Sequence, residues 1–421
     1  MRTIQEMRPK DLDVRLALGN LYTTQKKYGQ AITAYESALP LAPNPIPIYT
    51  TLIALHNQEN QFPQAVQACD KLESLLPRET PTDANVAQYV RSTREFLYLH
   101  KGRAYLGQGD YLNATEPLQR LIDLTPKSAI GHYRLGLAYA GSKNYIQAIT
   151  EYKRALQLDP TLTTAQLKLA NAYIAQEEYT KAIGECEQII ATQGTAPSQN
   201  AEAYYLAGVS YLGLGNYQKA LNQLQEALKR DPDAAESYVA IGNLYRQQKQ
   251  FDSAMRYYQM AIGRNSNTAS AHQGLASVYA LTGNTAQAIA EYNQVITLNP
   301  NAASPYNDLA WYYATQGTNL DTALEIAKKA VTMEPQSPIF RDTLGWVYYK
   351  KGMYREAITE LTTATMGTPK NPFIHYHLGM AYYANKEVNN AKQALQASLN
   401  ISADFPNAAE AKKLIQQIEG Q

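Results

Sequence analysis

The chain has 421 residues, with 38 Lys and Arg against 37 Asp and Glu, and a formal net charge of +1. This balance excludes a global field that attracts nucleic acid or an anionic membrane. Its 45% hydrophobic and 18% charged residues indicate an ordered chain, without a transmembrane run or enough cysteine for a disulfide framework.

A repeat of 34 residues extends along the chain. Place 8 of the repeat is Gly or Ala in ten copies, place 11 is Tyr in ten, and place 32 is Pro in eight. Place 20 is Ala in all eleven copies when one extra residue is allowed near Asn319. The copies begin at Leu12, Ile46, Glu95, Ala129, Thr163, Ala201, Ala235, Ala269, Ala303, Pro338 and Pro372.

In chain order, residues 1–11 come first, and Pro9 falls where a closing proline would stand. They are either an N-terminal cap or the end of a partial repeat. Copies one and two occupy residues 12–79, and an insertion occupies 80–94, of which Asn85 to Arg94 is predicted to extend the next helix backwards. Copies three to eleven occupy 95–405, with four extra residues from Pro197 expected in a loop. Residues 406–421 are predicted to form a polar capping helix.

Each copy contains two stretches of helical periodicity separated by a polar break, which predicts a pair of helices. Small residues at places 8 and 20 allow the two helices to approach closely. We expect the tyrosine at place 11 to fill the gap beside them, with its hydroxyl at the rim. Proline at place 32 is expected to end the second helix, because it lacks an N–H group.

This pattern resembles the tetratricopeptide repeat, and the resemblance covers residues 12–405. It implies an all-α fold, a solenoid with the form of a right-handed superhelix. The solenoid would contain eleven helix-turn-helix repeats and a C-terminal capping helix. In this family the first helices line the concave side, which usually binds a peptide segment of another protein.

Residues that carry chemistry in other proteins occupy repeat positions here. His132, His272 and His375 stand at place 4, and both cysteines, Cys69 and Cys186, stand at the buried place 24. Glu151 and Glu291 are interpreted as solvated residues of second helices. We therefore expect no catalytic residue, no metal site, no cofactor and no enzymatic activity.

Places 5, 9 and 12 share one face of each first helix, and the resemblance puts that face in the groove. Large residues at place 5 have an alternative interpretation, as packing between neighbouring first helices, whereas for Trp311, Trp346 and Tyr349 we favour a binding surface. In copies nine to eleven the predicted partner-binding residues are Trp311, Trp346, Tyr349, Tyr376, Met380 and Tyr383. In copies three to six they are Leu99, Arg103, Leu106, Tyr133, Leu137 and Tyr205.

The last third of the chain, from NDLAWYYATQ to ADFPNAAEAKKL, is similar to the C-terminal end of large bacterial tetratricopeptide proteins. These include lipoproteins of exopolysaccharide and protein-sorting (PEP-CTERM) loci. This similarity implies a bacterial protein that is part of a multiprotein assembly.

The expected function is that of a non-catalytic scaffold that binds a protein or peptide segment in its concave groove, without nucleic acid and without a membrane span of its own. Two alternatives remain open at this point. The protein is a permanent structural subunit of an envelope or membrane complex, or the repeat region of a larger protein with an upstream domain. We expect a cytoplasmic location if the chain is complete, and a periplasmic or membrane-associated one if an N-terminal signal region is missing. The pattern does not specify an oligomeric state.

Overall fold

A computed structural model describes residues 11–192 and 194–420 of the chain. The described residues form 23 α-helices and one short 3-10 helix, with no β-strand among them, which confirms the predicted all-α fold. The expected N-terminal cap or partial repeat falls on residues 1–11, and residues 1–10 lie outside the described range. None of the described helices is both long enough and apolar enough to cross a membrane.

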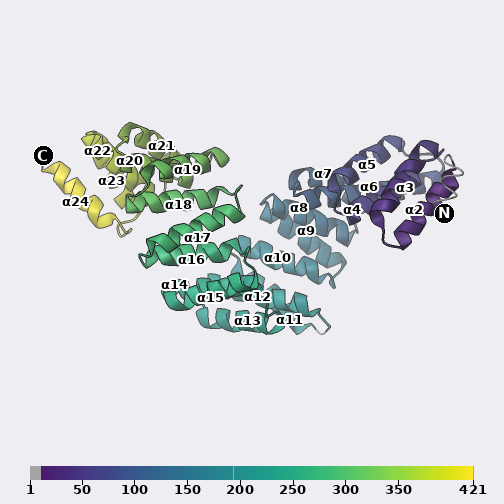
Figure 1. The fold of residues 1–421 in the computed structure, drawn as a ribbon, viewed down its shortest axis with the longest axis horizontal. Coiled ribbons are helices and arrows are strands. Elements are labelled where there is room, and N and C mark those ends of the chain that lie inside the picture. Colours follow the sequence, from purple (N-terminus) through teal and green to yellow (C-terminus); the bar gives the residue numbers. More distant parts are fainter. Residues whose placement is uncertain (1–10, 193, 421) are drawn as a thin grey trace. The chain divides into compact units, whose positions relative to one another are not determined.

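The described chain divides into two compact units, with the boundary between Pro232 and Asp233. In each unit, helices that follow one another in the chain lie side by side (Figure 1). Unit 1 contains α2 (Leu12–Thr24), α3 (Tyr28–Ala38), η1 (Leu39–Leu41), α4 (Ile46–Gln58), α5 (Phe62–Leu75), α6 (Ala84–Gln108), α7 (Tyr111–Leu124), α8 (Ala129–Gly141), α9 (Tyr145–Leu158), α10 (Thr163–Ala175), α11 (Tyr179–Ala191), α12 (Pro197–Gly213) and α13 (Tyr217–Arg230).

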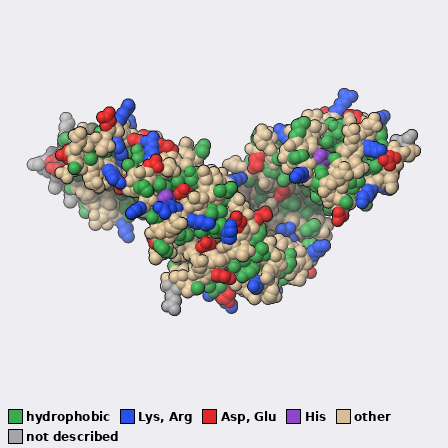
Figure 2. All heavy atoms as spheres, turned by 180° about the vertical axis from the view of Figure 1, so that it is seen from behind, with side chains coloured by type: hydrophobic (Ala, Val, Ile, Leu, Met, Phe, Trp, Pro, Cys, Tyr) green, Lys and Arg blue, Asp and Glu red, His purple; other side chains and the backbone are tan. Residues whose placement is uncertain are grey.

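Unit 2 contains the remaining helices of the chain. They are α14 (Ala235–Gln247), α15 (Phe251–Arg264), α16 (Ala269–Leu281), α17 (Thr285–Leu298), α18 (Ala303–Gln316), α19 (Leu320–Met333), α20 (Pro338–Lys350), α21 (Tyr354–Gly367), α22 (Pro372–Ala384), α23 (Val388–Ile401) and α24 (Ala408–Glu419). On the face drawn in Figure 2, Lys and Arg side chains are interspersed with Asp and Glu side chains, as the balanced net charge predicts.

Nine of the eleven first helices begin at the residue that opens the sequence copy. The exceptions are α6 and α12, which start earlier. The helix α6 starts at Ala84, as expected, because the Asp83 carboxylate accepts hydrogen bonds from the N–H groups of Asn85 and Val86, each at 2.9 Å. The four extra residues before copy six were expected in a loop, and this expectation is wrong. Pro197 occupies the first turn of α12, where its fixed φ angle favours a helix.

The turn between the two helices of every repeat contains a residue in the left-handed conformation at place 15, and in copy nine Asn319 is left-handed as well. The N–H group of the next residue bonds the carbonyl at place 11, as Asp110 does to Tyr105 at 2.9 Å, so the first helix ends in a Schellman motif. Five of the eleven left-handed residues at place 15 are glycine and six carry a side chain, namely Lys26, Asn60, Lys143, Glu177, Lys249 and Lys386. The turn therefore keeps the same left-handed conformation even where a side chain makes that conformation strained.

The two helices of a repeat meet where a glycine at place 8 faces the side chain at place 24. A Cβ atom on Gly136 would lie 2.5 Å from the Tyr152 ring, and one on Gly242 would lie 2.6 Å from the Tyr258 ring. The same pairing occurs for Gly19, Gly102, Gly208, Gly345 and Gly379. The side chain that meets the glycine is therefore the one at place 24, and tyrosines at place 11, such as Tyr105 and Tyr139, pack against the same cores. Most of those tyrosines are only half-buried, because they lie at the edge of the helix pair.

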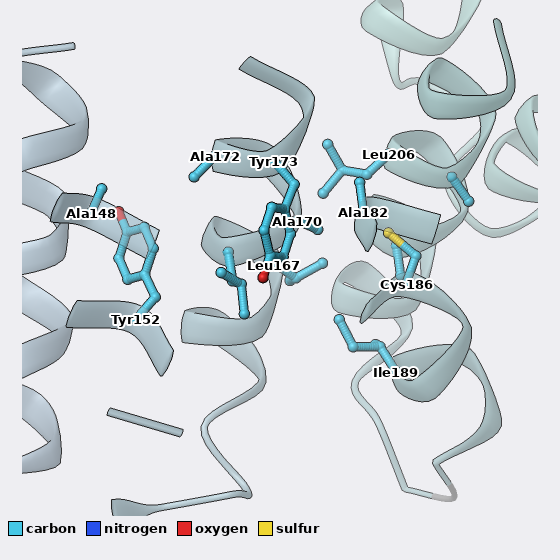
Figure 3. Close-up of a cluster of buried hydrophobic side chains, with 13 residues drawn as sticks. Ala148, Tyr152, Leu167, Ala170, Ala172, Tyr173, Ala182, Cys186, Ile189 and Leu206 are labelled. Atoms are coloured by element: carbon cyan, nitrogen blue, oxygen red, sulfur yellow. The ribbon is translucent and has the colours of Figure 1, made fainter. Parts of the chain in front are cut away.

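Neighbouring repeats share a continuous interior. Figure 3 shows such a cluster, in which Tyr152 of α9, Tyr173 of α10 and Cys186 of α11 lie among small alanines. Leu206 of α12 closes the cluster from the following repeat. Each repeat thus buries apolar surface against its neighbours, which no single helix pair achieves alone.

A polar contact at place 4 joins consecutive repeats. Nδ1 of His132 lies 2.6 Å from Oε2 of Glu151, and its Nε2 lies 3.2 Å from the carbonyl oxygen of Pro126 in the preceding repeat. His272 makes the same two contacts, with Glu291 and the Ser266 carbonyl. The interpretation of Glu151 and Glu291 as solvated residues is therefore wrong, because each carboxylate is half-buried against a histidine. Place 4 also bonds the carbonyl six residues earlier at Tyr306, Arg341 and His375.

The contact at place 8 predicts a cost for the smallest enlargement of a glycine. Gly242→Ala should lower the free energy of unfolding by about 1–3 kcal/mol, because Tyr258 is fully buried and has no room to move. Urea unfolding followed by circular dichroism measures the change. Gly263→Ala, in the second helix of the same repeat, is the control, because nothing lies within 4 Å of its added methyl group. An equal loss in both variants would contradict the packing argument.

The left-handed turn predicts opposite effects at two equivalent positions. Lys249→Gly should raise the free energy of unfolding by up to about 1 kcal/mol, because a left-handed residue with a side chain is strained. Gly283→Ala should lower it by about 1 kcal/mol for the same reason. Thermal and urea unfolding of the two variants test the pair. A destabilised Lys249→Gly variant would show that the lysine side chain contributes more than the strain costs.

Candidate functional site

The candidate site is the first-helix face, defined here as the residues at places 5, 9 and 12 of the first helices. In unit 2 its predicted members lie on three first helices: Trp311 on α18, Trp346 and Tyr349 on α20, and Tyr376, Met380 and Tyr383 on α22. In unit 1 they lie on α6, α8 and α12, as Leu99, Arg103, Leu106, Tyr133, Leu137 and Tyr205. Each unit is described in turn.

In unit 2 the helices α18, α20 and α22 bring four rings together, which we call the aromatic stack (Trp311, Trp346, Tyr349 and His377). The centroid of the Trp346 ring lies 4.7 Å from that of Tyr349, at an angle of 16°, and 4.3 Å from that of His377. The Trp311 centroid lies 5.6 Å from His377 and 6.5 Å from Trp346. Aromatic contacts of this kind fix the orientation of each ring in the stack.

The two tryptophans differ in exposure. The side chain of Trp311 is 36% exposed, whereas Trp346 is only 9% exposed. Trp346 is covered because Tyr349 and His377 flank its ring and Lys350 Nζ lies 5.0 Å from its centroid. The expectation that Trp346 offers an exposed contact surface is therefore wrong.

Tyr376 is also buried, with an exposed fraction of 2%. Its ring lies 5.8 Å from that of Phe405, and it belongs to the same apolar cluster as residues of α24. Its expected exposure is therefore wrong too, since the last helix of the chain covers it. Its packing fits the alternative given above for large residues at place 5. Tyr349, Met380 and Tyr383 are half-buried and keep part of their surface accessible.

Polar contacts between place 5 of one repeat and place 6 of the next join neighbouring first helices in unit 2. Nδ1 of His377 lies 2.8 Å from Oδ1 of Asp342, and both side chains are buried. Gln273 Nε2 donates to Oδ2 of Asp308 at 2.9 Å. Burial raises the pKa of Asp308, and hydrogen bonds from Gln273 and Asn307 oppose that shift. Places 5 and 6 thus join neighbouring first helices, whereas at place 9 Trp311 is exposed and Trp346 is buried.

In unit 1 the face contains an open pocket of about 370 Å³ between α6, α8 and α10. Leu106 and Leu137 line it together with Tyr111, Lys168 and Asn171. Two predicted residues are therefore brought together. Leu99 lines a different open pocket, of about 660 Å³, with Phe96 and Pro126 among its other walls. Tyr133 packs 6.2 Å from the Tyr152 ring, and Tyr205 packs against the cluster of Figure 3.

Three basic side chains of unit 1 influence one another, namely His100 and Arg103 on α6 and Arg134 on α8. Burial, together with the smaller effect of the charges of Arg134 and Arg103, lowers the pKa of His100 to about 4. Burial and the charge of Arg103 also lower the pKa of Arg134, whose Nη1 donates to the Leu99 carbonyl at 3.1 Å. Only Arg103 was predicted. The place-6 residues His100, Arg134, Asp308 and His377 were missed, although the repeat places them one residue beyond place 5.

The remaining reactive residue types are structural. Cys69 and Cys186 are fully buried, and burial raises the pKa of each thiol to about 12, which confirms their prediction as core residues. Within the described part of the chain, no group of three or more His, Cys, Asp or Glu side chains is placed to hold a metal ion.

The buried histidine predicts a pH dependence of stability. His100 binds a proton near pH 4 when folded but near its ordinary value of 6.5 when unfolded. The unfolded chain therefore binds the extra proton between these values, and stability falls as the pH falls from 6.5 towards 4. Between pH 7.5 and 4.5, the wild-type protein should lose more free energy of unfolding than His100→Phe, which keeps a ring beside Phe96. The difference should be on the order of 2 kcal/mol. Urea unfolding at both pH values measures this, and equal losses would contradict the assignment.

Family descriptions named tetratricopeptide repeat or TPR repeat match residues 12–45, 99–163, 161–233, 205–270, 239–307, 274–338, 345–386 and 374–405. No curated protein sequence matches the chain.

Among solved structures, one chain of the APC/C hetero-tetramer Cut9–Hcn1 is 17% identical, with a TM-score of 0.45, over 99% of this chain and 91% of that one. Yeast Tom70 is 14% identical, with a TM-score of 0.49, over 98% and 96%. Pseudomonas aeruginosa pilF is 18% identical, with a TM-score of 0.41, over 50% and 94%. The repeat matches along most of its length show that the chain belongs to the tetratricopeptide repeat family.

Proposed function

We propose that the protein is a non-catalytic scaffold that binds a segment of a partner polypeptide on its first-helix face. Stacked helical repeats commonly use such extended faces for binding other proteins. The observation that carries the proposal is Trp311, an exposed indole held in place by the rings of Trp346 and His377. Tryptophan is enriched among interface residues that dominate binding energy, and a ring that is already fixed loses little entropy when a partner covers it.

Half-buried residues of the same face supply the rest of the proposed contact surface in unit 2. Tyr349, Met380 and Tyr383 share the first-helix face with it and keep accessible surface. Trp346 and Tyr376 support these residues from below and are not assigned direct contacts. In unit 1 the pocket lined by Leu106 and Leu137 would take an apolar side chain of the partner, and Arg103 lies one turn before Leu106 on α6. The similarity of the last third of the chain to bacterial proteins supports an assembly in a bacterium as part of this proposal.

Selection from a random peptide library tests the proposal without a known partner. Peptides of twelve residues displayed on phage are selected on the folded protein, and their affinities are measured for variants. Trp311→Ala should weaken the selected peptides by at least about tenfold, the effect of losing an interface hot spot. Met366→Ala is the control, because Met366 is 76% exposed on the second helix α21, away from the first-helix face. Peptides that depend on Met366 and not on Trp311 would contradict the proposed site.

The two tryptophans also predict different effects on stability. Trp346→Ala should lower the free energy of unfolding by about 3–5 kcal/mol, because it removes a buried ring from the stack. Trp311→Ala should cost clearly less, because more than a third of that side chain is already in contact with water. Thermal unfolding of both variants separates loss of binding from loss of structure in the peptide experiment.

A further inference from the structure

The two equivalent tryptophans of unit 2 differ in the charge that covers them. Lys350 Nζ lies 5.0 Å from the centroid of the Trp346 ring, a cation–π contact within the protein. Among the residues that the structure describes, no Lys or Arg lies over Trp311, although both tryptophans occupy place 9 and belong to the same stack. Trp311 therefore presents an aromatic face that is exposed, fixed and without a cation.

A carboxylate lies one turn from that face. Asp308 precedes Trp311 by three residues on α18, so the two side chains project from the same side of the helix. The Asp308 carboxylate is half-buried and accepts hydrogen bonds from Gln273 and Asn307, both of them neutral. No ion pair is present for it among the described residues. A carboxylate withdrawn from water in this way is stabilised when a cation approaches.

The groups around Asp308 and Trp311 do not supply a cation to this position, so a ligand can. The carboxylate of Asp342, on the following first helix, is already bonded to His377. The His377 ring centroid lies 5.6 Å from that of Trp311. Burial and the charge of Asp308 raise the pKa of Tyr292 to about 12, so its phenol stays neutral beside Asp308. The side-chain oxygen of Asn307, next to Asp308, is buried and has no hydrogen-bond partner. Among the described residues, the site therefore has a carboxylate and an aromatic plane but no positive charge of its own.

We propose that Trp311 and Asp308 form a subsite for an arginine side chain of the partner segment. The guanidinium plane would stack on the indole of Trp311 while its N–H groups donate to the Asp308 carboxylate. Arginine suits this pair better than lysine, because its planar group stacks on aromatic rings and presents several donors at once. This inference rests on the proposed function, since it names the chemistry that the partner brings to the same face.

The two tryptophans allow a direct test, because the protein contains only these two indole groups. The full chain is labelled with ¹⁵N, and the two indole N–H signals are recorded while N-acetyl-arginine amide is added. The signals are assigned with Trp311→Phe. The Trp311 signal should shift in a saturable way, and the Trp346 signal should shift much less. N-acetyl-citrulline amide, a neutral analogue of the same shape, should have at least about tenfold lower affinity, because it lacks the charge.

Variants test the carboxylate. Asp308→Asn should weaken binding of N-acetyl-arginine amide by at least about tenfold. Asp404→Asn removes the same charge from an exposed loop before α24 and should leave the affinity within about twofold, because long-range effects of an exposed charge are screened. The thermal transition of each variant shows whether it is folded. If Asp308→Asn does not fold, raising the salt concentration and comparing arginine with citrulline on the wild-type protein provide the same test.

The proposal is overturned if the Trp346 signal responds instead of the Trp311 signal, or if citrulline binds as well as arginine. It is also overturned if Asp404→Asn weakens binding as much as Asp308→Asn, or if N-acetyl-lysine amide binds more tightly than the arginine compound. These readings do not depend on the peptide selection. A specific arginine response with no selectable peptide would reject the proposed function and leave the guanidinium subsite standing. Selected peptides that bind without any arginine preference would support the proposed function and reject the guanidinium subsite.

Discussion

The architecture depends on one steric constraint, the contact between the bare backbone at place 8 and the side chain at place 24. Where place 8 is glycine, a single added Cβ atom would lie within 3 Å of the facing Tyr or Leu. Because the facing side chain is fully buried at positions such as Tyr258 and Leu361, it fixes the distance between the two helices of the pair. The left-handed residue at place 15 then reverses the chain within a few residues. Each pair is therefore nearly the same unit, and the units stack.

When the repeats stack, some positions of the first helices contact neighbouring repeats and others remain exposed. Place 4 reaches back to the preceding repeat, as His132 does to the Pro126 carbonyl, and places 5 and 6 join neighbouring first helices, as Asp342 and His377 do. These contacts hold neighbouring repeats together. At place 9 of unit 2, Trp311 remains exposed, whereas Trp346 is buried. The proposed binding function rests on the exposed Trp311 side chain.

The two units present different chemistry on equivalent positions. Unit 1 places Arg103 and Arg134 close enough to influence each other, and it contains a pocket lined by Leu106 and Leu137. Unit 2 places an exposed indole beside a half-buried carboxylate at Asp308. The residues on the first-helix face can differ between repeats because they take no part in the contact between places 8 and 24. That contact, which sets the packing of each helix pair, stays the same.

The sequence by itself determined the all-α repeat, the starting residues of nine first helices and the burial of Cys69 and Cys186, because these follow from the spacing of small, aromatic and proline residues along one chain. It also identified Trp311 as an exposed residue of the first-helix face. Only the tertiary structure decided that Trp346 and Tyr376 are buried, since their covers, His377 and Phe405, come from later segments of the chain. It likewise decided that Pro197 starts a helix, that Glu151 bonds His132 and that no ion pair forms at Asp308 among the described residues. A pattern of residue types indicates which face of a helix a side chain occupies, but its exposure depends on which neighbours from other repeats reach that face.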